Sequence, residues 1–361
     1  MLVAANHHVA RTAPAVRSVT VGVDTHSQFH HAAVLDQAGQ FLADQRFDAT
    51  SNGYDQLVAW ASRYGHIERV GVESTGSYGA GLTRHLTASG ITVVEAGTQD
   101  AMVRARRGKD DRLDAITAAQ QTLTGAGTTP KDTTGIIESI RILTVVRDRA
   151  VKDRTAALNE IAALRVTAPE QLRRELTGLT TKALAKLAVS WDLADLDLTS
   201  PTDATRLALS RLGQRVTTLT TEITAADRDL TQLTGQVAPT LTTRPGIGPH
   251  SAARLLICAA QTIDRIHSEA SLARLTGVAP IPASSGKTHR MRLSRSGDRQ
   301  ANRALHMIVR SRLRYDPRTQ QFRARRLAQG DSKLDTIRVL KRHLIREIYQ
   351  AIKTDLDISR P

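Results

Sequence analysis

The stretch Val19–His26 reads VTVGVDTH and decides how the first part of the chain folds. Residues that favour β-structure alternate in it with small ones, which is typical of a buried strand. The run ends on a carboxylate, Asp24, so the strand delivers one acid to the edge of a sheet. A single acid there proves little, and its meaning depends on what neighbouring segments bring to the same edge.

The segments around this strand predict a mixed α/β domain. We expect strands at 18–24, 31–36, 40–47, 69–73 and 91–96, and helices over SNGYDQLVAWASRYG and YGAGLTRHLTASG. The sequence DQAGQ between the second and third strands carries a glycine turn signal, which indicates a hairpin or meander.

Three further carboxylates are placed to meet Asp24. Glu73 ends the strand RVGVE, and Asp111 and Asp114 begin a helix in GKDDRLDA. A spacing of three residues puts the two aspartates on one helix face, and acids at strand ends are where such sheets place their sites. Carboxylate oxygens suit Mg²⁺ or Mn²⁺, and two such ions can clamp a scissile phosphate. The alternative is that the aspartates are ordinary first-turn acids at a helix N-terminus.

The net charge favours a polyanionic partner. The 361 residues include 50 lysines and arginines against 35 acids, a formal net charge of +15, while aromatic residues make up 3%. Such an excess is typical of DNA- or RNA-binding proteins, and the few aromatics argue against a base-stacking platform. We find neither an apolar run of membrane-spanning length nor a secretory signal, so a soluble, cytoplasmic protein is expected.

Two long amphipathic segments follow the first domain. Apolar residues recur every three or four positions over 136–176 and again over 204–235, on either side of a short helical insert and the break SWDLADLDLTSPTD. The pattern predicts two long helices that form an antiparallel coiled-coil arm or a dimerisation element.

The last part of the chain opens with TTRPGIGPHSAARLLICAA. Gly246 and Gly248 in this run look like the turn of a helix-hairpin-helix, whose backbone N–H groups dock a DNA phosphate. A plain turn that enters a core helix is the alternative. Cys258, the single cysteine, lies in the apolar run and is expected to be a buried core thiol.

A basic loop and basic helices complete the chain. The loop ASSGKTHRMRLSRSGDRQ contains Ser284 and Ser285, and its basic residues include Lys287, His289, Arg290, Arg292, Arg295 and Arg299. The segment Gln320–Lys353 reads as basic helix. We interpret its outer face as a phosphate track rather than a solvated surface, and that face includes Arg338, Lys341, Arg342 and Arg346.

Three histidines, His26, His30 and His31, cluster near the first strand. Because side chains alternate between the faces of a sheet, we expect the three to be split rather than to bind zinc together.

Six motifs together resemble the DEDD-type transposases of the one-ten insertion-sequence family, in chain order. They are VGVDTH, GVESTG, GKDDRLDA, RPGIGPHSAARLL, LTGVAPIPASSGK and SRSGDRQANRAL, and the resemblance spans about residues 18–350. It implies a RuvC-like, ribonuclease-H-like domain over 18–130 and a C-terminal transposase domain over 239–361. The helical arm occupies 131–238, and residues 1–17 are expected to be a flexible tail.

The resemblance also implies roles for particular residues. The family's four metal-binding acids correspond to Asp24, Glu73, Asp111 and Asp114, and its nucleophilic serine corresponds to Ser285, the serine followed by glycine. A phosphoserine intermediate, donor and target DNA, a guide RNA from the element and a homo-oligomer (dimer or tetramer) are implied with them. So is a bacterial cytoplasm, in association with the nucleoid.

Two other functions stay open at this point. A RuvC-like nuclease could hydrolyse branched DNA with the four acids alone, Ser285 being incidental. A non-catalytic nucleic-acid-binding protein would use only the glycine-rich turn and the basic helices.

Overall fold

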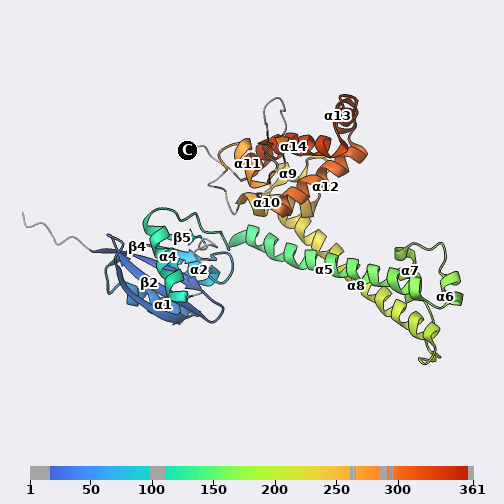
Figure 1. Cartoon of the computed structure of the whole chain (residues 1–361), viewed down its shortest axis with the longest axis horizontal. Coiled ribbons are helices and arrows are strands. Elements are labelled where there is room, and N and C mark those ends of the chain that lie inside the picture. The colour runs from blue at the N-terminus through green and yellow to red at the C-terminus, as the bar shows by residue number, and fades with distance from the viewer. Residues whose placement is uncertain are drawn as a thin grey trace, which may run out of the picture. The chain divides into compact units, whose positions relative to one another are not determined.

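The structure is a computed structural model that describes residues 17–97, 110–260, 263, 266–283, 291–292, 294 and 296–356. The chain divides into two compact units, Met1–Thr133 and Thr134–Pro361 (Figure 1).

The first unit is built on a five-stranded sheet with the strand order β3-β2-β1-β4-β5. The strands are β1 (Ser18–Thr25), β2 (Phe29–Asp36), β3 (Phe41–Asp48), β4 (His66–Glu73) and β5 (Val93–Ala96). β2 is antiparallel to both β1 and β3, whereas β4 is parallel to both β1 and β5. The expected mixed α/β domain and its hairpin are therefore confirmed.

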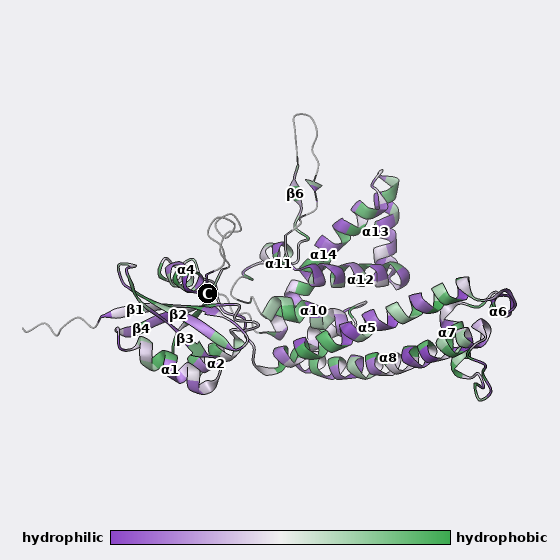
Figure 2. Ribbon diagram, turned by 60° about the horizontal axis from the view of Figure 1, so that its bottom comes forward, coloured by the Kyte–Doolittle hydropathy of each residue, from purple (hydrophilic) through white to green (hydrophobic). Residues whose placement is uncertain are grey.

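Alternation along β1 separates two layers of helix. The helices of this unit are α1 (Ser51–Ala61), α2 (Ala80–Ala88) and α4 (Asp111–Leu123). Val19, Val21 and Val23 are buried in one hydrophobic cluster with residues of α1 and α2. Gly22, between them, faces α4 on the other side of the sheet, and Figure 2 shows α4 on the face opposite α1 and α2.

Two glycines of the sheet lie where α4 packs against β1 and β4. Gly22 and Gly71 are register partners on β1 and β4. A Cβ on Gly22 would lie 2.1 Å from the backbone nitrogen of Ala119 and 2.2 Å from the carbonyl oxygen of Ala115. A Cβ on Gly71 would lie 1.9 Å from Thr122 Oγ1. Helix backbone cannot move aside as a flexible side chain can, so glycine at position 22 permits this close contact.

We expect Gly22→Ala to lower the free energy of unfolding by about 3 kcal/mol, the upper part of the usual range for overpacking. The matched control is Gly235→Ala in α8 (Pro201–Val237), where an added Cβ meets nothing within 4 Å. That variant should be slightly stabilised, since alanine favours helix. Scanning calorimetry of both variants checks this, and an unchanged melting temperature for Gly22→Ala would contradict it.

The second unit begins with two long helices, α5 (Gly135–Thr167) and α8, as the sequence predicted. Arg147 of α5 pairs with Asp227 of α8 at 2.9 Å, and Ile161 shares a buried cluster with Leu209. Later residues of α5 thus meet earlier residues of α8, so the helices are antiparallel. They lie side by side in Figures 1 and 2, with α6 (Glu170–Glu175) and α7 (Thr181–Val189) at the far end.

The rest of the second unit is mainly helical. It comprises α9 (Pro239–Thr242), α10 (Pro249–Ala260), α11 (Glu269–Leu275), α12 (Arg299–Tyr315), α13 (Pro317–Ala328), α14 (Lys333–Asp355) and the short strands β6 (Ile281–Pro282) and β7 (Met291–Arg292). Leu256, Leu305 and Ile348 belong to its core, and so do Ile140 and Leu230 from the base of the long helices. The base of the arm and the C-terminal helices therefore share one core.

Cys258 lies in this core, as expected, and its side chain is 4% exposed. Burial raises the pKa of the thiol to about 12, so the group stays protonated and unreactive at neutral pH.

The expectation of continuous helix over Gln320–Lys353 is wrong. α13 ends at Ala328, and Gly330 adopts a left-handed conformation (φ +92°) that no helix interior accommodates. Ser332 then caps α14 by accepting a hydrogen bond from the backbone N–H of Asp335.

Among the described residues, no helix combines the length and apolar character needed to cross a membrane.

Candidate functional site

Two of the four predicted acids end neighbouring parallel strands. Asp24 is the residue before the last in β1, and Glu73 is the last residue of β4. Their exposed fractions are 4% and 8%. Val23 pairs with Val72, so the next residues along, Asp24 and Glu73, are neighbours on one face. Asp24 lies two residues after Gly22, and Glu73 lies two residues after Gly71. Both glycines face α4, so the two acids lie on the face of the sheet that α4 covers.

The other two predicted acids begin α4. Ala115 and Ala118, whose backbone contacts the sheet glycines, follow Asp111 and Asp114 by one helical turn. Both aspartates therefore lie on the side of the helix that faces the sheet, and Asp114 is 6% exposed. Topology and helical period bring all four acids to the same edge of the sheet.

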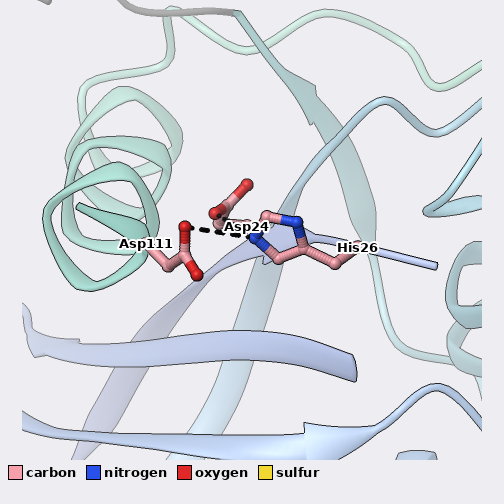
Figure 3. Close-up of side chains that lie close together, drawn as sticks. All are labelled: Asp24, His26 and Asp111. Atoms are coloured by element: carbon pink, nitrogen blue, oxygen red, sulfur yellow. Dashed lines mark hydrogen bonds and ion pairs between the residues drawn. The ribbon is translucent and has the colours of Figure 1, made fainter. Parts of the chain in front are cut away.

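His26 connects two of these acids (Figure 3). Its Nε2 atom lies 3.1 Å from Asp24 Oδ2 and 3.2 Å from Asp111 Oδ1. One ligand atom from each of the three residues lies within 4.8 Å of the others. The position of His26 two residues after Asp24 in extended chain is the sequence signal that their side chains lie on the same side.

The other two histidines lie elsewhere. His31 pairs with Asp44 at 2.8 Å. His30 is fully buried and stacks on Tyr54 with the ring centres 5.6 Å apart, and burial lowers the pKa of its imidazole. Within the described part of the chain the three histidines form no common site, in line with the expected split.

The start of α4 is tied to the sheet by Arg112. Its Nε lies 2.8 Å from Asp44 Oδ1 on β3, and its guanidinium stacks over the ring of Phe41 at 4.8 Å. Asp110 caps the helix by accepting a hydrogen bond from the backbone N–H of Arg112. These contacts hold the first turn, and with it Asp111, over the end of β1.

The donor set suits a divalent cation. Carboxylate oxygens of Asp24 and Asp111 are hard ligands of the type that Mg²⁺ and Mn²⁺ prefer. The His26 nitrogen could complete such a site, because imidazole is a common ligand of transition metals. The residues present therefore fit a bound divalent ion.

The glycine-rich turn at Gly246 and Gly248 is hydrogen-bonded to α12. Gly246 has φ +76°, which favours glycine. The carbonyl oxygen of Pro245 accepts a hydrogen bond from Arg312 Nε at 2.8 Å, and the same guanidinium makes a two-pronged ion pair with Glu347. A Cβ on Gly248 would meet nothing within 4 Å, so the second glycine of the turn borders open space.

Of the other predicted nucleic-acid contacts, Arg292 on β7 and Arg299 at the start of α12 are exposed. The predicted nucleophile Ser285 lies outside the described residues, and so do Lys287, Arg290 and Arg295.

The basic face of α14 differs from the expectation. Arg338 pairs with Asp335, and both Arg342 and Arg346 pair with Glu269 of α11. The assignment of Lys341 to the outer face is wrong, because its side chain is 7% exposed. Lys341 precedes the buried Ile345 by one helical turn, so the apolar period of the helix already placed it inward.

An acid of the arm holds the start of α10. Asp148 of α5 binds His250 Nε2 at 2.7 Å and also binds the guanidinium of Arg254. Burial alone would raise the pKa of this carboxyl, but the hydrogen bonds from His250 and Arg254 outweigh it and hold the pKa well below its usual range. These residues line a cavity of about 880 Å³ whose wall also includes Gly248 and Arg303.

We expect Asp148→Asn to lower the free energy of unfolding by roughly 1–3 kcal/mol, because two half-buried donors, His250 and Arg254, lose a charged acceptor. The pKa is depressed in the folded state, so this stabilisation is complete above the unfolded pKa near 4 and is lost as pH falls through the folded value. The difference in the free energy of unfolding between wild type and variant should therefore become smaller below about pH 4. Denaturant unfolding at a series of pH values measures this difference. The control is Asp153→Asn, which removes a surface ion pair with Arg149. Equal destabilisation by the two substitutions would contradict the prediction.

The sheet order and the acids at its edge define the first unit as a mixed α/β domain consistent with a RuvC-like fold. A family model for the DEDD transposases of IS110, described as "Transposase", matches residues 21–167. A second model, described as "Transposase IS116/IS110/IS902 family", matches residues 238–324. The two matches together span more than half of the chain, which belongs to the IS110 family of transposases.

A curated relative agrees with this family. The chain is similar to the "Insertion element IS110 uncharacterized 43.6 kDa protein" of Streptomyces coelicolor, with 29% identity over 118 residues. The matched region covers 32% of this chain and 29% of the relative, less than a third of that protein's length.

Proposed function

We propose that this transposase cuts and rejoins DNA by phosphoryl transfer, with Asp24, Glu73, Asp111 and Asp114 as metal ligands and Ser285 as nucleophile. The observation that carries the proposal is the meeting of Asp24 and Asp111 at one imidazole nitrogen, 3.1 and 3.2 Å away. These acids come from distant parts of the sequence. Carboxylates that converge in this way, one buried and one half-buried, repel one another unless a cation joins them.

The acids have separable tasks in this proposal. Asp24 and Asp111 offer the carboxylate oxygens that hold a divalent ion, and Glu73 and Asp114 offer further oxygens on the same face. Mg²⁺ or Mn²⁺, when bound, supplies positive charge for the phosphate and eases deprotonation of an oxygen nucleophile. His26 keeps the first two carboxylates oriented toward one point.

Ser285 supplies the covalent chemistry. Its Oγ loses its proton and attacks phosphorus, so that the Oγ–P bond forms and the P–O bond to one DNA segment breaks. The departing DNA oxygen takes up one proton, which balances the proton lost by the serine. The phosphoserine ester retains the energy of the phosphodiester, so a second DNA hydroxyl can reverse the step on a new strand. This accords with the absence of a GxxxxGK[ST] nucleotide-binding motif from the sequence. Lys287 and Arg290 would neutralise the charge that develops on phosphorus.

The partners follow from charge and family. The formal net charge of +15 supports binding to donor and target DNA and to a guide RNA from the element. In this proposal residues 18–130 form the catalytic domain, 131–238 the coiled-coil arm that joins a dimer or tetramer, and 239–361 the domain that carries Ser285. The turn at Gly246 and Gly248 acts as a helix-hairpin-helix phosphate contact, and the protein works in the bacterial cytoplasm at the nucleoid.

The test is a strand-exchange assay. Purified protein is mixed with RNA transcribed from its own locus, a labelled DNA junction and Mg²⁺, then denatured and separated on a gel. Joined strands and a labelled protein–DNA adduct are the expected products. Cleaved DNA without adduct or joined strands would support the nuclease alternative, and bound but unchanged DNA would support the binding-protein alternative.

A further inference from the structure

Lys341 is a buried cation in the middle of α14. Its ammonium carries three N–H donors, and the hydrogen bond that it makes within the described part of the chain goes to Asn302 Oδ1 at 2.8 Å. None of its contacts there is with a carboxylate. A buried lysine is costly unless an anion offsets its charge, so the lack of a described acid partner calls for an explanation.

Asn302 is oriented toward this lysine by the backbone. Its amide nitrogen donates hydrogen bonds to the carbonyl oxygens of Thr276 and Gly277, at 2.8 and 3.1 Å. The amide oxygen is thereby turned to Lys341. Asn302 thus fixes the ammonium in place but leaves its positive charge without compensation.

The neighbourhood adds positive charge. Burial lowers the pKa of Lys341, and the nearby Arg338 lowers it further. Burial likewise lowers the pKa of His306, with Lys341 and Arg310 adding to the effect. These shifts have the sign expected for buried basic groups that have other cations beside them.

A cavity of about 440 Å³ opens onto this group between α12 and α14. Basic side chains in its wall are those of Arg299, Arg303, His306 and Lys341. Among the described residues of that wall the one carboxylate is Asp298. It already accepts hydrogen bonds from the backbone N–H groups of Gln300 and Ala301 as the cap of α12.

Lys341 also borders the base of the serine loop. It lines a second cavity, of about 520 Å³, whose wall includes Pro280 and Met291. Pro280 lies just before β6 and Met291 lies in β7, and Ser285 falls between these two strands in the sequence. The acids in that wall, Asp331 and Asp335, pair with Arg326 and Arg338. A group bound at Lys341 would therefore lie beside the root of that loop.

We propose that the cavity between α12 and α14 binds a phosphate of a nucleic-acid backbone, with Lys341 as its buried contact and Arg303 as its exposed one. A phosphate supplies the missing negative charge, and its oxygens can accept the donors that Asn302 leaves unused on Lys341. The inference rests on the proposed function in that the bound strand would be a substrate or guide of the transposase.

The experiment measures binding in EDTA, so that no metal-dependent chemistry takes part. Full-length Lys341→Met is compared with Lys333→Met, a matched control on the same helix whose lysine is exposed. The probes are a labelled DNA duplex and a labelled RNA transcribed from the locus, each titrated over a range of salt concentrations.

Lys341→Met should weaken binding about tenfold or more, as expected for a lost hydrogen bond between charged groups. Its salt slope should fall by about one, which is the signature of one lost phosphate contact. Lys333→Met should bind nearly as the wild type does. Loss for DNA alone identifies a DNA strand as the occupant, loss for RNA alone identifies the guide, and loss for both identifies a shared phosphate site.

Arg303→Gln keeps the proposal testable if Lys341→Met does not fold, because Arg303 is exposed. This variant should weaken binding and keep the wild-type melting temperature. A folded Lys341→Met that binds both probes like the wild type would overturn the proposal. So would an unfolded Lys341→Met together with normal binding by Arg303→Gln. Failure of strand exchange with intact Lys341-dependent binding would count against the proposed function alone.

Discussion

Asp24→Asn should abolish strand exchange, with a rate loss of at least about a thousandfold. The substitution keeps the size of the side chain but removes a negative charge from the meeting point of Asp24, His26 and Asp111. Charge stabilisation by a catalytic metal is worth several kcal/mol, and about 4 kcal/mol corresponds to a thousandfold in rate. Nucleic-acid binding should persist, because the basic residues of the second unit are untouched.

Asp36→Asn is the matched control for this change. Asp36 ends β2 and pairs with Val19 at the opposite end of β1 from Asp24, so the same chemical change occurs in the same sheet away from the acids. The control should retain exchange activity. Titration with Mn²⁺ by calorimetry adds a readout that does not depend on catalysis, and weaker binding is expected for Asp24→Asn alone. Full activity of Asp24→Asn would remove this acid from the mechanism.

Ser285→Ala should eliminate the covalent protein–DNA adduct and the exchanged product together. Without the hydroxyl, no Oγ–P bond can form, and the phosphodiester energy cannot be stored in the protein. Binding of DNA and RNA should be unchanged, since one hydroxyl contributes little to an interface dominated by charge. The adduct is measured on a denaturing gel after incubation with the junction, the RNA and Mg²⁺.

Ser284→Ala is the control next to it in the chain. It should form the adduct at the wild-type level, because in the proposed mechanism the nucleophile is the serine immediately before glycine. An adduct lost in Ser284→Ala but kept in Ser285→Ala would move the role to the neighbouring serine. Cleavage without adduct in all three proteins would instead favour hydrolysis by the acids alone.

Patterns among adjacent residues were enough to predict most elements. VTVGVDTH became β1, the turn in DQAGQ joined β2 to β3, and the amphipathic runs became α5 and α8. Alternation in strands, helix caps and the helical period each depend on a few neighbouring residues, and so the elements they specify can be predicted directly from the sequence. The prediction of helix over Gln320–Lys353 rested on an apolar period that lies entirely after Gly330, whereas the glycine ends the helix before it.

The four acids illustrate a second level. Their types and order in the chain, together with the family motifs, predict that they meet, and the structure brings Asp24 and Asp111 to one imidazole nitrogen. What brings them together is the pair Gly22 and Gly71, which lets α4 lie directly on the sheet. The sequence contains these glycines, but their use depends on register between β1 and β4.

Only the folded chain decides which charges are buried and which partners they have. His26 bridges Asp24 and Asp111, Asp148 clamps His250 and Arg254, and Lys341 turns inward to Asn302. Composition showed a large positive excess, but it could not separate the ion-paired arginines of α14 from the buried lysine between them. Each of these groupings brings together segments that are distant in sequence. The free energy of a charge depends on its distance to other charges and to water, and only tertiary packing sets those distances.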